Sequence, residues 1–265
     1  KAIIVSNDTV WPLFGAEVSQ AFQETGIRIQ TIIVPDGEVE KNLDRWQWLV
    51  TQILGAGVDR QTPIVALGGG VIGDLAGFAA STVMRGLPLV QVPTSLLAMV
   101  DSSVGVKTAV NTHHGKNLVG TFYQPAVVYV PIHTLAQLPE KELRSGLGEV
   151  IKHGILSDPV LLTRCRTDAE EIMHRNLDIL EDLVVRSIGV KSSVVAKDER
   201  ERGLRAILNL GHTVGHAIES TLMDTQNALP HGICVAIGIL AEVSWAHTRG
   251  ACSVETLNAC RETMV

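Results

Sequence analysis

Four residues that could bind a metal or an anion recur at helical spacing between positions 205 and 216. They are Arg205, Asn209, His212 and His216, and steps of four, three and four residues place them on one face of a predicted helix. Most residues between them are apolar, which indicates a largely buried helix. Buried guanidinium, amide and imidazole groups are costly unless something binds them, so the pattern predicts a site for a metal, an anion or a polar ligand. The alternative is a pair of hydrogen-bonded core histidines, because an isolated H-x-x-x-H pattern is short.

The composition argues against several classes of protein. The chain has 265 residues, of which 46% are hydrophobic and 4% aromatic, with a formal net charge of -6. The negative charge and the few aromatic residues argue against nucleic-acid binding. The four cysteines lack CxxC spacing, so we expect reduced thiols and neither a zinc ribbon nor a disulfide framework. No segment has the roughly 18 apolar residues that a membrane-spanning helix needs, and no signal-peptide pattern is present, so we expect a soluble, cytoplasmic protein.

The first half alternates strand-like and helix-like segments. Strands are expected at 2–5, 29–34, 63–67, 89–92 and 126–130, with helices at about 41–54 and 75–82 between them. This alternation predicts an α/β domain with a parallel, Rossmann-like sheet covered by helices on both faces. Polar clusters follow the strand ends, where such sheets bind their ligands.

A glycine-rich segment follows the third expected strand. Gly68, Gly70 and Gly73 satisfy G-x-G-x-x-G in an expected loop from Gly68 to Asp74, which lets backbone N–H groups approach a pyrophosphate. The usual acidic residue about 20 positions later is missing, since no acid occurs before Asp101. We interpret the segment as the phosphate loop of a non-standard nucleotide domain; an ordinary tight turn is the alternative.

Polar residues gather again between 101 and 117. Asp101, Lys107, Lys116 and Asn117 lie in glycine-flanked segments, a composition that suits a phosphorylated or carboxylated small molecule. Either lysine taken singly is more often a solvated surface charge.

The pattern changes to helices after Pro139, so we place a domain boundary near residue 140. Glu149 and Lys152 lie three apart on one face of an amphipathic segment, where a surface ion pair is the simple interpretation. Glu149, His212 and His231 together make a carboxylate and two imidazoles, a set suited to a catalytic zinc ion if the three converge. Both ends of the chain fall within expected secondary structure, so we expect a fragment of a longer protein.

Six segments resemble the 3-dehydroquinate synthase family. They are ALGGGVIGDLAGFAA, QVPTSLLAMVDSSVGVKTAVN, GKNLVGTFYQP, GLGEVIKHGI, DERERGLRAILNLGHTVGHAIES and LPHG. The similarity runs in order over nearly the whole chain. It implies an α/β NAD-binding domain at 1–140, an α-helical metal- and substrate-binding domain at 141–265, and a missing part at each outer end. It also implies NAD and one divalent metal, usually Zn²⁺ with Co²⁺ possible, in a cytoplasmic homodimer.

The implied reaction converts 3-deoxy-D-arabino-heptulosonate 7-phosphate to 3-dehydroquinate in the shikimate route to chorismate. The metal ligands of the family correspond, by their place in the matching motifs, to Glu149, His212 and His231. The residues implied for NAD are Asp36, Gly37, Glu38, Lys41, Gly70, Val71, Ile72, Gly73, Asp74, Thr94, Ser95, Lys107, Lys116, Thr134, Leu135, Ala136 and Gln137. Those implied for the phosphorylated substrate are Arg85, Asp101, Lys107, Asn117, Lys152, Lys191, Arg205, Asn209 and His216.

The chain departs from the family pattern in three places. Val106 stands where the family usually has Gly, His153 follows the EVIK motif where the family has Tyr, and Ile233 replaces an acid next to the expected ligand His231. Loss of that acid is expected to loosen the contacts that hold the ligand. Three alternatives stay open: another NAD- and metal-dependent sugar-phosphate cyclase, a metal-dependent alcohol or glycerol dehydrogenase, and a non-catalytic relative.

Overall fold

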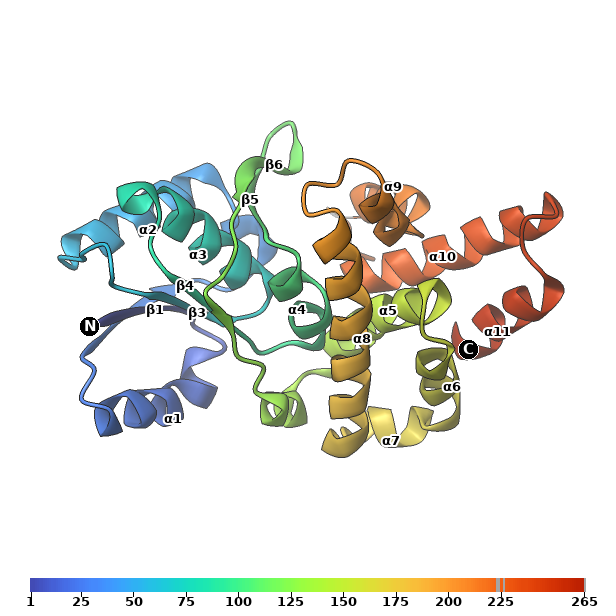
Figure 1. Cartoon of the computed structure of the whole chain (residues 1–265), viewed down its shortest axis with the longest axis horizontal. Coiled ribbons are helices and arrows are strands. Elements are labelled where there is room, and N and C mark those ends of the chain that lie inside the picture. Colours follow the sequence, from blue (N-terminus) through green and yellow to red (C-terminus); the bar gives the residue numbers. More distant parts are fainter. Residues whose placement is uncertain (223–224, 226, 265) are drawn as a thin grey trace. The chain divides into compact units, whose positions relative to one another are not determined.

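The chain folds into two units, which we describe separately. The structure is a computed structural model that describes residues 1–222, 225 and 227–264. Unit 1 comprises Lys1–Thr94 and Val106–Pro131, and unit 2 comprises Ser95–Gly105 and Ile132–Val265 (Figure 1). The chain therefore passes between the units three times, whereas the sequence analysis placed one boundary near residue 140.

Unit 1 contains a five-stranded parallel sheet in the order β2-β1-β3-β4-β7. The strands are β1 (Ala2–Asn7), β2 (Ile29–Val34), β3 (Ile64–Gly68), β4 (Leu89–Pro93) and β7 (Val127–Val128). Side chains alternate between the two faces, as the two-residue period of a strand requires. Ile3 and Val5 belong to one core, and Ala2 and Ile4 belong to another on the opposite face. The predicted parallel sheet is confirmed.

Helices cover both faces of this sheet, with α1 on one side and α2 and α3 on the other (Figure 1). They are α1 (Trp11–Glu24), α2 (Leu43–Gly55) and α3 (Gly70–Thr82), with short 3₁₀ turns η1 (Glu38–Glu40) and η2 (Val83–Arg85). Trp11 and Phe22 of α1 pack against the Ala2 and Ile4 side, whereas Leu49 of α2 belongs to the opposite core. The loop predicted from 68 to 74 is mostly helical, because α3 already begins at Gly70.

An antiparallel hairpin, which the sequence analysis missed, completes unit 1. It pairs β5 (Lys107–Thr112) with β6 (Gly115–Phe122). A Cβ at Gly120 would lie 2.0 Å from the carbonyl oxygen of Thr108, so only glycine permits the pairing there. Val106, just before the hairpin, has φ 53°. That left-handed conformation is unfavourable for a β-branched residue and favours the glycine typical of the resembled family.

Unit 2 is almost entirely helical. Its helices are α4 (Leu96–Val100), α5 (Glu140–Leu156), α6 (Pro159–Thr167), α7 (Ala169–Met173), α8 (Leu177–Lys197), α9 (His212–Leu222), α10 (His231–Thr248) and α11 (Val254–Met264), with turns η3 (Ser102–Val104), η4 (Ile132–Gln137) and η5 (Leu204–Asn209). Helix α8 runs unbroken from Leu177 to Lys197.

Glycines allow α5, α9 and α10 to approach one another closely. A Cβ at Gly148 would lie 2.0 Å from the Gly232 carbonyl oxygen, and one at Gly232 would lie 1.8 Å from that of Ser145. A Cβ at Gly238 would lie 2.0 Å from the carbonyl oxygen of Gly211. The helix backbones are therefore in direct contact, which brings the residues next to these glycines together.

The single helix predicted from 205 to 216 is wrong. Turn η5 ends at Asn209, and α9 starts at His212 after a break at Leu210 and Gly211. Gly211 has φ 79°, and a Cβ there would lie 2.6 Å from the Val235 carbonyl oxygen. The break follows from the close packing of Gly211 on α10, which the local residue pattern does not reveal.

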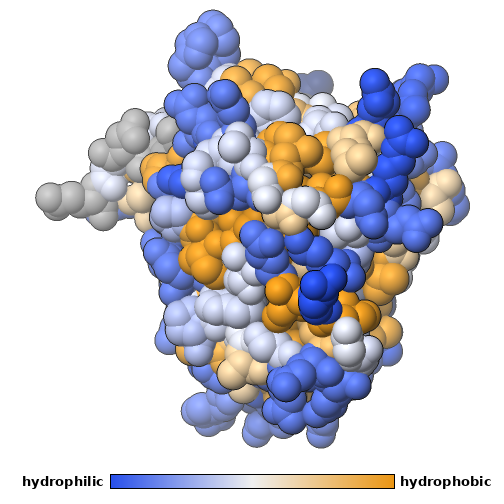
Figure 2. All heavy atoms as spheres, turned by 90° about the vertical axis from the view of Figure 1, so that its left-hand side faces the viewer, coloured by the Kyte–Doolittle hydropathy of each residue, from blue (hydrophilic) through white to orange (hydrophobic). Residues whose placement is uncertain are grey.

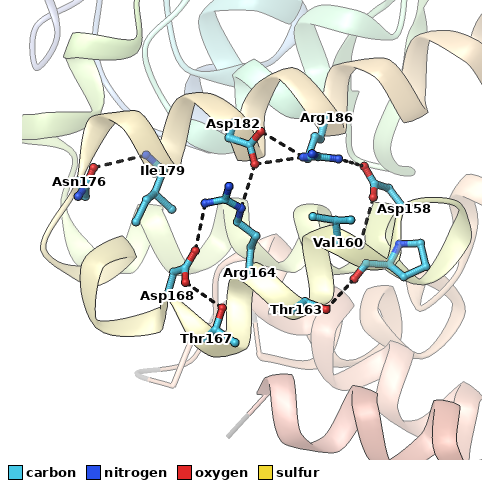
Figure 3. A network of polar contacts seen from close by, with 11 residues as sticks. Asp158, Val160, Thr163, Arg164, Thr167, Asp168, Asn176, Ile179, Asp182 and Arg186 are labelled. Atoms are coloured by element: carbon cyan, nitrogen blue, oxygen red, sulfur yellow. Dashed lines mark hydrogen bonds and ion pairs between the residues drawn. The ribbon is translucent and has the colours of Figure 1, made fainter.

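Ion pairs tie α6 to α8 at the surface of unit 2 (Figure 3). Arg186 pairs with Asp158 and Asp182 at 3.1 Å, and Arg164 pairs with Asp168 at 3.2 Å and Asp182 at 3.1 Å. Each arginine bridges two carboxylates, and Asp182 joins the two arginines into one network. These ion pairs hold α6 against α8, the helix that also carries Lys191.

The surface mixes polar and apolar residues. Figure 2 shows one face of the molecule, on which hydrophobic residues form separate patches between hydrophilic side chains. Scattered apolar residues of this kind are normal at protein surfaces. Among the described residues, no helix has the length and apolar character required to cross a membrane.

Candidate active site

The centre of unit 2 is the carboxylate of Glu149 on α5, which is completely buried. Its Oε1 lies 3.8 Å from Nε2 of His212 and 4.0 Å from Nε2 of His231. Lys152, one turn along α5, forms an ion pair with Oε2 of Glu149. Apart from this pair, neither carboxylate oxygen accepts a hydrogen bond from the described residues. The Glu149–Lys152 pair is buried, so the simple interpretation as a surface ion pair is wrong.

Each of the two histidines near Glu149 is oriented through its other ring nitrogen. Nδ1 of His212 lies 3.3 Å from the carbonyl oxygen of Leu210, and Nδ1 of His231 lies 3.1 Å from Oε2 of Glu219. A carbonyl or carboxylate oxygen only accepts, so we assign the ring hydrogen to Nδ1 in both residues. Both Nε2 lone pairs are then available on the Glu149 side.

The environments shift the pKa values of the two imidazoles in opposite directions. Burial lowers the pKa of His212, and the charge of Lys152 lowers it further. Burial would also lower the pKa of His231, but the hydrogen bond to Glu219 and the charge of Glu149 raise it overall. His212 is therefore the readier of the two to act as a neutral ligand.

These side chains fit a divalent metal ion. Two ligand atoms on a tetrahedral zinc ion lie roughly 3.4 Å apart, slightly less than the separations of Glu149 Oε1 from the two Nε2 atoms. Oε1 of this buried carboxylate accepts no hydrogen bond from the described residues, as expected of an oxygen that binds a metal, while Oε2 pairs with Lys152. His212, His216 and His231 likewise bring ligand nitrogens within 4.8 Å of one another. The region thus offers three imidazoles and one carboxylate to a metal.

Three buried cations lie in the same unit. The exposed fractions of Lys152, Lys191 and Arg205 are 1%, 5% and 3%. Nζ of Lys191 donates to the backbone oxygen of Asp101 at 2.6 Å and to its Oδ1 at 2.5 Å. The Arg205 guanidinium donates to the carbonyl oxygens of Glu199 and Gly105 at 2.6 and 2.5 Å. Burying three cations in an acidic chain is costly unless anions bind them.

The Asp101–Lys191 pair has a definite charge state. Burial alone would raise the pKa of Asp101, but Lys191 and Lys152 outweigh it and hold that pKa well below its usual range. Burial lowers the pKa of Lys191, although Asp101 opposes the shift. Asp101 is thus a carboxylate at neutral pH and a fixed partner for the ammonium group.

The remaining unit 2 candidates, Asn209 and His216, are both exposed. Asn209, at the end of η5, donates to Oε1 of Glu201 at 3.0 Å. His216 is exposed on α9, with its ring centroid 5.1 Å from that of His212 and 5.7 Å from that of His231. Substrate candidates Asp101, Lys152, Lys191, Arg205, Asn209 and His216 therefore belong to the same unit as the expected metal ligands.

The expected nucleotide site of unit 1 lies at the switch point of the sheet. Strand β1 lies between β2 and β3. The strand order therefore runs to one side of β1 with β2 and to the other side with β3 and β4. In such sheets ligands bind beyond the carboxyl ends of these central strands. Strand β1 ends at Asn7, β3 ends at Gly68, and α3 begins at Gly70 with its N-terminus at this edge. Backbone N–H groups of a helix N-terminus suit a pyrophosphate.

Polar side chains around this edge are held in place. Asp36 follows β2 and accepts from Nδ2 of Asn7 at 2.6 Å and from Oγ1 of Thr9 at 3.1 Å. Lys41 is 5% exposed and pairs with Oδ2 of Asp74 at 2.5 Å. The donor set therefore fits a nucleotide: a helix N-terminus for phosphate and carboxylates for ribose hydroxyls.

The other nucleotide candidates are distributed over both units. Gly37, Glu38, Val71, Ile72, Gly73, Thr94 and Lys116 belong to unit 1, and Ser95, Thr134, Leu135, Ala136 and Gln137 belong to unit 2. Ile72 and Leu135 are at most 1% exposed, so their side chains belong to the core and not to a ligand surface. Ser95 accepts a hydrogen bond from the backbone N–H of Ala98 and caps α4.

Three substrate candidates belong to unit 1. Arg85 is exposed in η2 with φ 70°, and Lys107 and Asn117 are exposed on the hairpin. The backbone N–H of Asn117 donates to Oδ1 of Asn111 at 2.9 Å, which fixes its position on β6.

Two residues of this region were missed as site candidates. His153 is completely buried, its ring nitrogens have no hydrogen-bond partner among the described residues, and its ligand atom lies within 4.8 Å of those of Asp101 and Glu149. Glu219 orients His231. Helical spacing could have indicated His153, which is four residues from Glu149, whereas no local pattern links Glu219 to His231.

Two family models match this chain. The model described as 3-dehydroquinate synthase N-terminal matches residues 31–145, and the one described as 3-dehydroquinate synthase C-terminal matches residues 146–265. A 3-dehydroquinate synthase of Pelobacter propionicus is 46% identical over 253 residues, which are 96% of this chain and 70% of that protein.

Two solved structures share the fold closely. One is a 2-deoxy-scyllo-inosose synthase complexed with carbaglucose-6-phosphate, NAD⁺ and Co²⁺, with a TM-score of 0.90 and 28% identity over 99% of this chain and 71% of that one. The other is the 2-epi-5-epi-valiolone synthase of Streptomyces hygroscopicus with NAD⁺ and Zn²⁺ bound, with a TM-score of 0.92 and 27% identity over 99% of this chain and 73% of that one.

Proposed function

This chain belongs to the 3-dehydroquinate synthase family, and from that premise we propose that it converts 3-deoxy-D-arabino-heptulosonate 7-phosphate to 3-dehydroquinate and phosphate. One observation carries the proposal. Unit 2 sets two oriented imidazoles around the buried Glu149 carboxylate and buries three cations in the same unit. That combination suits a substrate that has both a metal-binding hydroxyl and two anionic groups.

Glu149, His212 and His231 would hold the divalent metal. A bound metal ion supplies Lewis acidity and orients the substrate oxygens. Other residues of the chain fix the positions of these three ligands. Leu210 and Glu219 orient the two imidazoles, and the glycine contacts of α5 with α10 position Glu149. Zinc and cobalt in the two related cyclases support a divalent ion of this type.

The N-terminus of α3 and the residues around Asp36 and Lys41 would hold NAD. NAD, when bound, supplies a hydride acceptor that can later return the hydride. Lys41 and Asp74 neutralise each other, so the Lys41 ammonium stays fixed beside the helix N-terminus instead of moving in solvent. The other nucleotide contacts are proposed from the residues named for NAD in the sequence analysis.

Lys152, Lys191 and Arg205 would bind the phosphate and carboxylate of the substrate. The Arg205 guanidinium is held by its hydrogen bonds to two carbonyl oxygens. Its remaining N–H donors can bind a carboxylate or phosphate in bidentate fashion. Asp101 holds the Lys191 ammonium in one place. Asn209 and His216 are proposed to contact the substrate in the same unit. The roles of Arg85, Lys107 and Asn117 in substrate binding are proposed from the family resemblance alone.

A second candidate is a cyclase that acts on another sugar phosphate. The two solved structures support it, because their names are those of other cyclases. The curated relative is more similar in sequence, at 46% identity against 28% and 27%, so we favour the heptulosonate phosphate. Turnover of a hexose phosphate in preference to the heptulosonate phosphate would reverse this choice.

We also propose that the protein works as a homodimer in the cytoplasm, as the family resemblance implies. Light scattering at micromolar concentration tests the first part, and a monomer mass would refute it. Cell fractionation tests the second part, and recovery outside the cytoplasmic fraction would refute it.

The experiment that tests the proposal is a phosphate-release assay. Purified protein is supplied with the heptulosonate phosphate, Zn²⁺ and a catalytic amount of NAD. Phosphate should be released and the release should stop when a chelator removes the metal. Absence of phosphate release with metal and NAD present would refute the proposed activity.

A further inference from the structure

Helix α9 contacts the expected metal site twice. It begins with the expected ligand His212, and two turns later Glu219 accepts a hydrogen bond from Nδ1 of His231 at 3.1 Å. His231 is the first residue of α10, so this bond joins the two helices. The exposed fraction of the Glu219 side chain is 12%, which shields the bond from competing water.

We propose that Glu219 is a positioning residue that sets the metal affinity of the site through His231. The proposal rests on the metal site proposed above. A carboxylate that accepts from one ring nitrogen fixes the tautomer, holds the plane of the ring and makes the other nitrogen a stronger donor to a metal. Here that other nitrogen is Nε2, which lies 4.0 Å from Oε1 of Glu149.

The two imidazoles are held by acceptors of different charge. His212 donates to the neutral carbonyl of Leu210, whereas His231 donates to an ionised carboxylate. A charged acceptor makes a hydrogen bond roughly twice as strong as a neutral one. Glu219 also adds a negative charge to a region where Lys152 offsets that of Glu149 and Lys191 that of Asp101. Removing it should therefore weaken the binding of a divalent cation.

The position that usually carries an acid beside this ligand carries none here. The residue two positions after His231 is Ile233, and the sequence analysis expected the ligand to be held loosely for this reason. In the structure the carboxylate comes from α9, twelve residues earlier in the chain. Within the described residues, Glu219 is therefore the acid that holds the His231 ring.

Zinc affinity tests the proposal without any need for turnover. Metal-free protein is titrated with Zn²⁺ in competition with a chromophoric chelator, for the wild type and for Glu219→Ala, Glu219→Gln and Ser220→Ala. Glu219→Ala should weaken zinc binding by about 10–100-fold. Glu219→Gln should weaken it by several-fold, because its amide oxygen still accepts the hydrogen bond but carries no charge. The control residue Ser220 is exposed on the same helix, and its substitution should change nothing.

The tautomer of His231 provides an independent measurement. Long-range ¹H–¹⁵N spectra of the metal-free wild type should show His231 protonated at Nδ1, and Glu219→Ala should shift the population towards the Nε2-protonated form. If Glu219→Ala does not fold, the affinity of Glu219→Gln decides. Unchanged zinc affinity in the folded Glu219 variants would overturn the proposal. A Glu219-dependent zinc affinity without phosphate release would refute the proposed reaction and leave this inference standing.

Discussion

The Nε2 atom of His212 lies 3.8 Å from Oε1 of Glu149, although the two residues come from different helices. The contact exists because α5 and α9 both pack on α10, and glycines make each packing close. Oε2 of Glu149 pairs with Lys152, but Oε1 accepts no hydrogen bond from the described residues, so the contact suits a shared metal ion better than a core hydrogen bond.

Replacing His212 by alanine should therefore remove the bound metal. Elemental analysis of purified protein should give about one zinc ion per chain for the wild type and little for His212→Ala, because a catalytic zinc keeps three protein ligands. His174→Ala serves as the control, since His174 is exposed elsewhere in unit 2. Unchanged zinc content in His212→Ala would refute its assignment as a ligand.

The glycine at the contact of α5 with α10 should tolerate no side chain. A Cβ at position 148 would lie 2.0 Å from a backbone oxygen of Gly232, so Gly148→Ala should lower the free energy of unfolding by about 3 kcal/mol. It should also displace the neighbouring Glu149 and reduce zinc affinity. Gly189→Ala in α8 is a matched control: no atom lies within 4 Å of the added Cβ, and alanine favours a helix by up to about 1 kcal/mol.

Urea unfolding of both variants measures these free energies. Equal stabilities for Gly148→Ala and Gly189→Ala would contradict the close backbone contact of α5 with α10.

The buried pair of Lys191 and Asp101 should show energetic coupling. The side chains of Lys191 and Asp101 are 6% and 31% exposed, so water screens the pair only in part. Lys191→Met and Asp101→Asn should each lower the free energy of unfolding by about 1–3 kcal/mol, and the double variant should lose less than the sum. Additive losses in this cycle would mean that the two groups do not interact.

An exposed pair provides the comparison. Arg144 and Glu140 are spaced i,i+4 on α5, and their side chains are 55% and 58% exposed. Their coupling should be no more than about 0.5 kcal/mol.

The buried His153 should make the metal-free protein sensitive to acid. Burial, assisted by the charge of Lys152, lowers the pKa of His153 to about 4, against an ordinary value of 6.5. Between these values the unfolded chain binds a proton that the folded chain does not. The stability is therefore complete above pH 6.5 and is lost as the pH falls towards 4.

His153→Phe should remove this dependence, because the ring is of similar shape and does not titrate. Between pH 7 and pH 5 the wild type should lose about 2 kcal/mol more than the variant in urea unfolding of the metal-free protein. Parallel losses in the two proteins would show that His153 keeps an ordinary pKa in the fold.

Local sequence patterns predicted the fold of unit 1 well. Runs such as Ala2 to Val5 and Ile29 to Val34 became central and edge strands because β-branched and apolar residues suit a sheet that helices cover on both faces. The hairpin of β5 and β6 was missed because its residues had been interpreted as ligand-binding loops. Its pairing depends on Gly120, whose role is visible only when the two strands meet.

The candidate site was harder to derive, because its geometry depends on contacts between helices. The spacing of Glu149 and Lys152 is the same on an exposed helix and on a buried one, and only the packing of α5 decides between them. Likewise, the spacing from Arg205 to His216 predicted one helix, but Gly211 breaks the chain where it packs on α10. The pairing of Glu219 with His231 links two helices and has no local pattern at all.

The ratio of product to NADH tests the central claim most directly. A reaction with excess heptulosonate phosphate, Zn²⁺ and NAD at a small fraction of the substrate concentration is followed by mass spectrometry for 3-dehydroquinate and by absorbance for NADH. The account predicts many molecules of 3-dehydroquinate for each molecule of NAD and no net NADH at the end. One NADH accumulating for each substrate consumed, with no 3-dehydroquinate formed, would contradict it and indicate a dehydrogenase.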